Sequence, residues 1–125
     1  MTPAEARELW VAALRSGDYP QSRGHLKDDV GFCCLGVACE VAIANGEELD
    51  VEQHGTHLSY YDGAAYVLPD KVRRWLGLRD DEGTFRPPVE DRYNALTELN
   101  DAGWSFNMIA DFIESDPEGL FEVEP

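Results

Sequence analysis

The sequence has few basic residues, and this shortage excludes several classes of function. Ten lysines and arginines stand against 25 aspartates and glutamates, a formal net charge of −15. An acidic body repels phosphate backbones, so we expect no direct binding to nucleic acid. The longest apolar run is too short and too interrupted to span a bilayer, and no basic start leads into an apolar core. We therefore expect no membrane partner and no signal peptide.

Cysteine is scarce as well. The three cysteines are an odd number, and Cys33 and Cys34 are adjacent, which argues against a disulfide framework and for a reducing compartment. Together with His54 and His57 they offer ligands for zinc, but their spacing is not that of a zinc knuckle. Because free cysteine is usually buried, we expect core thiols, no metal and no other cofactor. A Cys–His nucleophile pair stays open, since sequence does not show which side chains meet.

Apolar residues are concentrated in residues 31–46, where Glu40 is the single charge. Such a segment predicts a buried central helix at about 34–44, entered through a short extended segment at 31–33. Thr2, Pro3 and Glu5 form a capping-box pattern that predicts a helix over 3–16. Its expected apolar face consists of Ala6, Leu9, Trp10, Ala13 and Leu14.

The remaining segments predict shorter elements. Helical spacing and end signals indicate helices over 69–76, 88–101 and 105–115. The Asp62-Gly63 turn signal predicts a β-hairpin near 59–67, and residues 84–86 have the character of an edge strand. The 125 residues are therefore expected to form one domain (1–125) of the α+β class, predominantly helical, with four or five helices around the central helix and a small β-hairpin.

Cationic and aromatic side chains in two loops are candidates for a ligand pocket. They are Arg23, His25, His54, His57, Tyr60 and Tyr61. Such groups suit a nucleotide or another small phosphorylated molecule. The competing interpretation is that the tyrosines cover the core and keep their hydroxyls in water.

A second candidate site is an acidic face on the predicted helices 88–101 and 105–115. Its residues are Glu90, Glu98, Asp101, Asp111 and Glu114. These carboxylates either keep the protein soluble, or imitate a line of phosphates and so occupy the binding surface of a nucleic-acid-binding protein. The same region could form a helix-turn-helix, but it has a single base, Arg92, where a recognition helix needs several. A structural helical hairpin is the better interpretation.

Four segments stand in a recognisable order, with the patterns LRSGxYxQxxGxL, CCLGV, WLGL and LND. This order resembles a group of small uncharacterised proteins encoded by bacteriophages and prophages, common in those of actinobacteria. The resemblance implies a phage accessory origin and supplies no catalytic residue. We therefore expect a non-enzymatic protein that acts by binding in the host cytoplasm, as an acidic protein-interaction module or an inhibitor of a host nucleic-acid-binding or defence protein. Its partner would be a host or phage protein; the alternatives are a nucleotide-like small ligand held by the Tyr/His/Arg loops, or a structural role.

Overall fold

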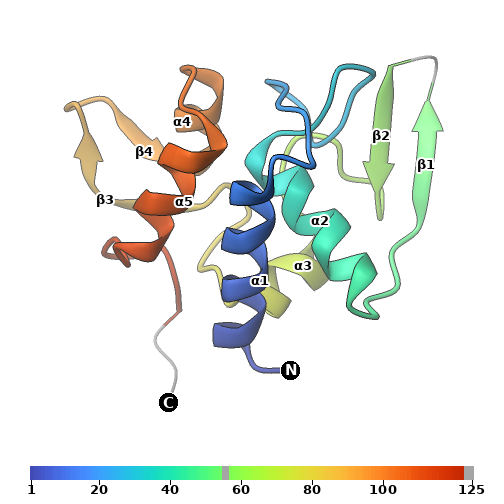
Figure 1. The fold of residues 1–125 in the computed structure, drawn as a ribbon, viewed down its shortest axis with the longest axis horizontal. Coiled ribbons are helices and arrows are strands. Elements are labelled where there is room, and N and C mark those ends of the chain that lie inside the picture. Colours follow the sequence, from blue (N-terminus) through green and yellow to red (C-terminus); the bar gives the residue numbers. More distant parts are fainter. Residues whose placement is uncertain (55–56, 123–125) are drawn as a thin grey trace.

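The structure is a computed structural model that describes residues 1–54 and 57–122, without the side chain of His54. Within these residues the chain is α+β, with five helices and two small antiparallel sheets (Figure 1). The elements are α1 (Pro3–Ser16), α2 (Cys34–Ala44), β1 (Val51–His54), β2 (Leu58–Tyr61), α3 (Asp70–Leu76), β3 (Thr84–Val89), β4 (Tyr93–Ala95), α4 (Leu96–Asp101) and α5 (Phe106–Glu114).

Four helices have the bounds that local sequence signals predict, to within a residue or two. Helix α1 begins with a complete capping box, in which Thr2 Oγ1 accepts from the Glu5 amide at 3.2 Å and Glu5 Oε1 accepts from the Thr2 amide. Gly17, in the left-handed conformation, ends it. Helix α3 also ends at a left-handed glycine, Gly77, whereas α2 begins without a side-chain cap and ends at Asn45. Ser105 caps α5 by accepting from the Met108 amide.

Helix α2 is buried as expected, but it does not stand alone at the centre. Eight of its 11 residues are buried. It packs against α1, α3 and α4, whereas α1 packs against α2, α3 and α5, so the two helices share the middle of the molecule (Figure 1). Helices make up 39% of the structure, and strands together with isolated β-bridges 19%, a mixture that does not support the description "predominantly helical".

The prediction of a hairpin near 59–67 was wrong about the partner strand. The turn exists, because Tyr61 and Ala64 exchange both backbone hydrogen bonds around Asp62 and Gly63. However, the next described element after the turn is helix α3, and β2 pairs instead with the preceding β1, in a register that places Val51 opposite Tyr61. The acidic content of residues 47–52 concealed β1, since charged residues are poor strand formers.

The prediction of a helix over 88–101 was also wrong in its first half. Residues 84–95 form the β3–β4 hairpin, and α4 occupies only 96–101. The strand predicted at 84–86 is confirmed and extends to Val89. The reversal between the strands uses Glu90 and Asp91 with φ of 54° and 58°. Non-glycine residues seldom adopt this conformation, so a Glu-Asp pair is a weak turn signal.

The face of α1 that enters the core differs slightly from the predicted one. Ala6, Trp10 and Leu14 are buried as expected, but Leu9 is 37% exposed and Val11 takes its place inside. The buried stripe is therefore rotated toward Val11, which lies on the side of α5. None of the described helices combines the length and apolar character that crossing a membrane requires.

Candidate functional site

The α1–α2 loop (residues 17–33) is held by side chains that bind backbone atoms. Asn100, at the end of α4, is fully buried. Its Oδ1 accepts from Gln21 Nε2 at 2.9 Å and from the Cys34 amide at 3.2 Å, while its Nδ2 donates to the Ser22 carbonyl at 2.8 Å. Gln21 Nε2 also donates to the Trp104 carbonyl. One amide side chain thus joins the loop, the start of α2 and the end of α4.

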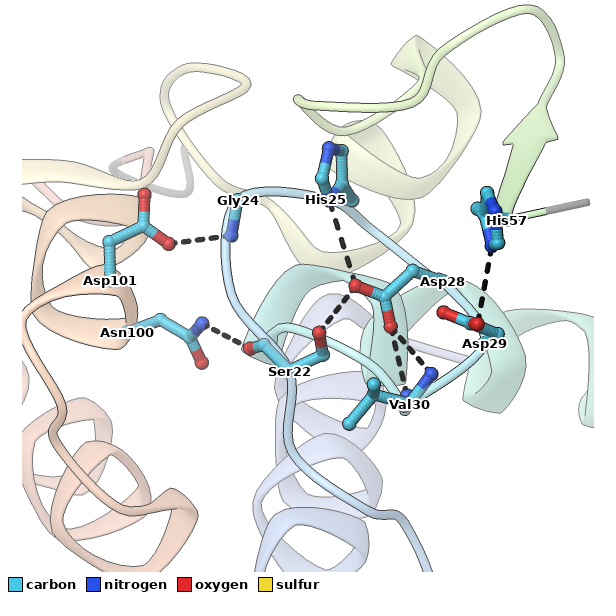
Figure 2. A network of polar contacts seen from close by, with 10 residues as sticks. Ser22, Gly24, His25, Asp28, Asp29, Val30, His57, Asn100 and Asp101 are labelled. Carbon is cyan, nitrogen blue, oxygen red and sulfur yellow. Dashed lines mark hydrogen bonds and ion pairs between the residues drawn. The ribbon is translucent and has the colours of Figure 1, made fainter.

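Asp28 organises the second half of this loop (Figure 2). Its Oδ2 accepts from Ser22 Oγ at 2.5 Å, and its Oδ1 accepts from the amides of Val30 and Gly31. Burial raises the pKa of Asp28, but the hydrogen bonds from Ser22, Gly31 and Val30 outweigh it and hold the pKa below its ordinary value. The carboxylate therefore stays ionised and acts as a fixed acceptor for the turn.

The loop also approaches α2 very closely. A Cβ on Gly36 would lie 1.7 Å from the Leu26 carbonyl oxygen, so only glycine fits at this point of the helix. Across the loop, Asp101 Oδ1 accepts from the Gly24 amide at 2.9 Å (Figure 2). Gln21, Gly24, Asn100 and their neighbours are the residues of the sequence patterns described above. Their contacts join the loop to α2 and α4 and so stabilise the fold.

The structure separates the side chains of the predicted Tyr/His/Arg pocket. Tyr61 is fully buried and donates from its hydroxyl to Glu40 Oε2 at 2.7 Å, so it belongs to the core. Burial, and then the bond to Glu40, raise the pKa of this hydroxyl. His57 is exposed, with Nδ1 3.2 Å from Asp29 Oδ2 (Figure 2). Arg23 is exposed as well, and its guanidinium lies beside Gly103.

His25 is a predicted pocket residue that does border a cavity. Its ring packs on Tyr66 with centroids 5.3 Å apart, and its Nδ1 lies 3.6 Å from Asp28 Oδ2. Together with Cys33 and Asp101 it borders a cavity of about 30 Å³. That volume is enough for a water molecule and far below that of a nucleotide site. Tyr60 is half-buried on β2, and the His54 side chain lies outside the described residues.

The three cysteines are buried, as expected from their apolar neighbours. Burial raises the pKa of Cys33 to about 11 and the pKa values of Cys34 and Cys39 well above the ordinary thiol value. Because the thiolate is the nucleophile, protonated buried thiols argue against a Cys–His pair, even though Cys33 and His25 share a cavity. In the described part of the chain, no three His, Cys, Asp or Glu side chains are grouped to hold a metal ion.

The five carboxylates of the predicted acidic face are all exposed and belong to elements that lie together in the structure (Figure 1). Glu90 is in the β3–β4 turn, Glu98 and Asp101 are on α4, and Asp111 and Glu114 are on α5. Glu98 accepts a hydrogen bond from the Asn94 amide, just as Asp101 accepts one from the Gly24 amide, so both carboxylates also hold backbone in place.

A groove between α1 and α5, which was not predicted, forms a further hollow of the described surface. We call it the α1–α5 groove; its volume is about 520 Å³, within the range of roughly 300–1,000 Å³ typical of ligand sites. The residues that line it are Arg7, Glu8, Val11, Ala12, Arg15, Ile113, Glu114, Asp116 and Phe121. The contribution of α1 follows the spacing i, i+3, i+4, i+7 of one helical face, from Glu8 to Arg15. The combination of charged and apolar residues on this one helical face was the signal in the sequence that could have indicated the groove.

Two arginines of α1 border the groove and are both engaged within the protein. Arg15 forms ion pairs with Asp111 and Glu114 of α5, and these hydrogen bonds, that with Glu114 first, raise the pKa of its guanidinium. Arg7 Nε donates to the Leu76 carbonyl at 2.9 Å, and its guanidinium lies 3.8 Å from the centre of the Phe121 ring. They therefore tie α1 to α5, α3 and the C-terminal segment.

The fold and these two regions define a small α+β protein with an internally bonded loop and an open interhelical groove. Residues 2–117 match a family described as a domain of unknown function, DUF8296, and the chain belongs to this family. No curated protein and no solved structure matches the chain.

Proposed function

We propose that this protein is a non-enzymatic phage accessory protein that binds a basic protein in the host cytoplasm through its acidic surface. The observation that carries the proposal is the exposure of all five carboxylates on neighbouring elements β3–β4, α4 and α5. From residue 84 to residue 118 there are eight acidic residues and two basic ones, Arg86 and Arg92. The field of such a surface attracts a cationic partner over distances of about a Debye length.

A partner that normally binds nucleic acid fits this surface best. Such proteins present clustered lysines and arginines to phosphates, and carboxylates spaced over a compact surface can occupy the same groups. The protein would then inhibit its partner by competing with nucleic acid. The resemblance to phage and prophage proteins supports this role, because an accessory protein of that origin acts on host machinery.

The test is affinity capture from a bacterial lysate with the immobilised protein, at about 50 mM and about 500 mM NaCl. We expect basic proteins to be retained at low salt and released at high salt. The triple variant Glu90→Gln, Glu98→Gln, Asp101→Asn should lose them, and its side chains keep the acceptors that bind the Asn94 and Gly24 amides.

A matched control removes the same number of charges elsewhere, with Asp18→Asn, Glu48→Gln and Asp50→Asn. These three side chains are exposed. The control should capture the same proteins as the wild type, and each captured protein, once purified, should lose DNA or RNA in a mobility-shift assay when the wild type is added. Equal capture by both triple variants would refute the proposal.

A further inference from the structure

The α1–α5 groove has a floor of apolar side chains. Val11 and Ile113 belong to the core, at 7% and 3% exposed, and half-buried Phe121 also lines the groove. Ala12 is exposed and contributes only a methyl group, so no side chain of α1 covers the floor at this point. A groove between helices with apolar side chains in its lining is a common form of binding surface.

The charges around the groove are acidic in balance, because Arg7 and Arg15 stand against Glu8, Asp111, Glu114 and Asp116. Arg15 is shared by Asp111 and Glu114, which leaves that cluster negative by one charge. Glu8 and Asp116 also line the groove, and among the described residues neither forms an ion pair. The rim therefore offers carboxylates to a bound molecule on both sides, from α1 and from the segment that follows α5.

We propose that the α1–α5 groove binds a basic amphipathic helix of the partner protein. The inference rests on the proposed function, because it assigns the partner's docking segment within the same acidic surface, next to Asp111 and Glu114. The apolar face of the helix would cover Val11, Ala12 and Ile113, and lysines or arginines at its edges would reach Glu8 and Asp116. This is the helix-in-groove mode of recognition, in which apolar anchors supply affinity and flanking charges set orientation.

The chemistry of the groove favours this occupant over an acidic or purely polar segment. An acidic segment would meet the unpaired carboxylates of Glu8 and Asp116, and a polar one would make no apolar contact with the lining side chains Val11, Ala12 and Ile113. The basic helix is the occupant that covers the floor and neutralises the rim together.

The probe is a synthetic helical peptide of leucine and lysine with all leucines on one face. A peptide of the same composition in scrambled order has the same charge and no apolar face. In isothermal titration calorimetry we expect the amphipathic peptide to bind at least about tenfold more tightly than the scrambled one. Part of its affinity should survive about 500 mM NaCl, since burial of apolar surface is not screened.

Two variants locate the site. Ala12→Trp fills the groove without changing charge, and Ala4→Trp makes the same change at another exposed position of α1 outside the groove lining. Ala12→Trp should weaken the amphipathic peptide about tenfold or more, and Ala4→Trp should not. Glu8→Lys reverses a rim charge and should also weaken binding, whereas Glu48→Lys, away from the groove, should change it little; this pair decides the matter even if Ala12→Trp folds poorly.

The outcomes separate this inference from the proposed function. Equal binding of the two peptides, or unchanged affinity of both Ala12→Trp and Glu8→Lys, would overturn the groove assignment. The proposed function would then still stand if lysate capture remained sensitive to the Glu90, Glu98 and Asp101 variant. Capture that is lost in Ala12→Trp but retained in that triple variant would place recognition in the groove and refute the wider acidic surface.

Discussion

The α1–α2 loop and the α1–α5 groove adjoin the same helix but use polar side chains in opposite ways. In the loop, Asn100, Asp28 and Asp101 bind backbone amides and a carbonyl, so each of these three side chains has a partner inside the protein. In the groove, Glu8 and Asp116 face outward, and Arg15 forms ion pairs whose members remain accessible to water.

The difference separates residues that build the fold from residues that remain for binding. A buried polar group that loses its partner costs the full penalty of desolvation, so the loop is expected to tolerate little change. Exposed ion pairs contribute little to stability, so changes in the groove are expected to leave the fold intact. The following measurements test this contrast.

The largest effect is expected for Gly36→Ala. The added Cβ would lie 1.7 Å from the Leu26 carbonyl oxygen, a backbone atom, so α2 and the loop must move apart. We expect the free energy of unfolding to fall by about 4 kcal/mol or more, measured by urea denaturation. Gly17→Ala is the control: its Cβ meets nothing within 4 Å, and the left-handed φ of 78° should cost only about 1 kcal/mol. Equal losses would contradict the close approach.

Asn100→Ala should be the next most damaging change. It leaves the Cys34 amide and the Ser22 carbonyl without their side-chain partner at a fully buried site. We expect a loss of about 3 kcal/mol by urea denaturation. Asn107→Ala, on the exposed face of α5, should stay within about 0.5 kcal/mol of the wild type. A comparable result for the two asparagines would show that the loop does not depend on this amide.

Asp28→Asn tests the loop through pH. Because hydrogen bonds hold the folded-state pKa of Asp28 below its unfolded value, the ionised carboxylate stabilises the fold at neutral pH. That stabilisation is lost as the pH falls through the folded-state pKa. The variant should therefore be less stable than the wild type by about 1 kcal/mol at neutral pH, with the difference shrinking in the acid range. A difference independent of pH, in urea titrations across that range, would exclude the carboxylate as its cause.

The smallest effect on folding is expected in the groove. Ala12→Trp adds a side chain to open space and should leave the free energy of unfolding within about 0.5 kcal/mol of the wild type. Arg15→Ala breaks exposed ion pairs with Asp111 and Glu114, and its thermal midpoint should match that of the wild type. A marked loss of stability in either variant would make the groove part of the folding core and remove the contrast between the two regions.

Several elements were predictable because their signals are local. The capping box of Thr2 and Glu5, Gly17 after α1 and Ser105 before α5 lie within a few residues of the helices they delimit. The strand at residue 84 was predicted in part, and the turn at Asp62 and Gly63 was predicted without its correct pairing.

The errors share one physical cause, which is that the deciding contacts join distant parts of the chain. Strand β1 owes its conformation to β2, and the β3–β4 hairpin closes over two left-handed acidic residues with no glycine to indicate them. The candidate pocket gathered residues by chemical type, and Tyr61 went to the core because Glu40 of α2 accepts its hydroxyl.

The ends of most helices, the apolar character of α2 and the large excess of acidic residues can be predicted from the sequence, because they depend on composition and on neighbours along the chain. Packing decides which stripe of α1 is covered, how Asn100 reaches Gln21, and where a groove remains open. The contacts at these places join residues far apart in the chain, such as Gln21 and Asn100, 79 positions apart, and Arg15 and Asp111, 96 positions apart, so they exist only in the packed molecule.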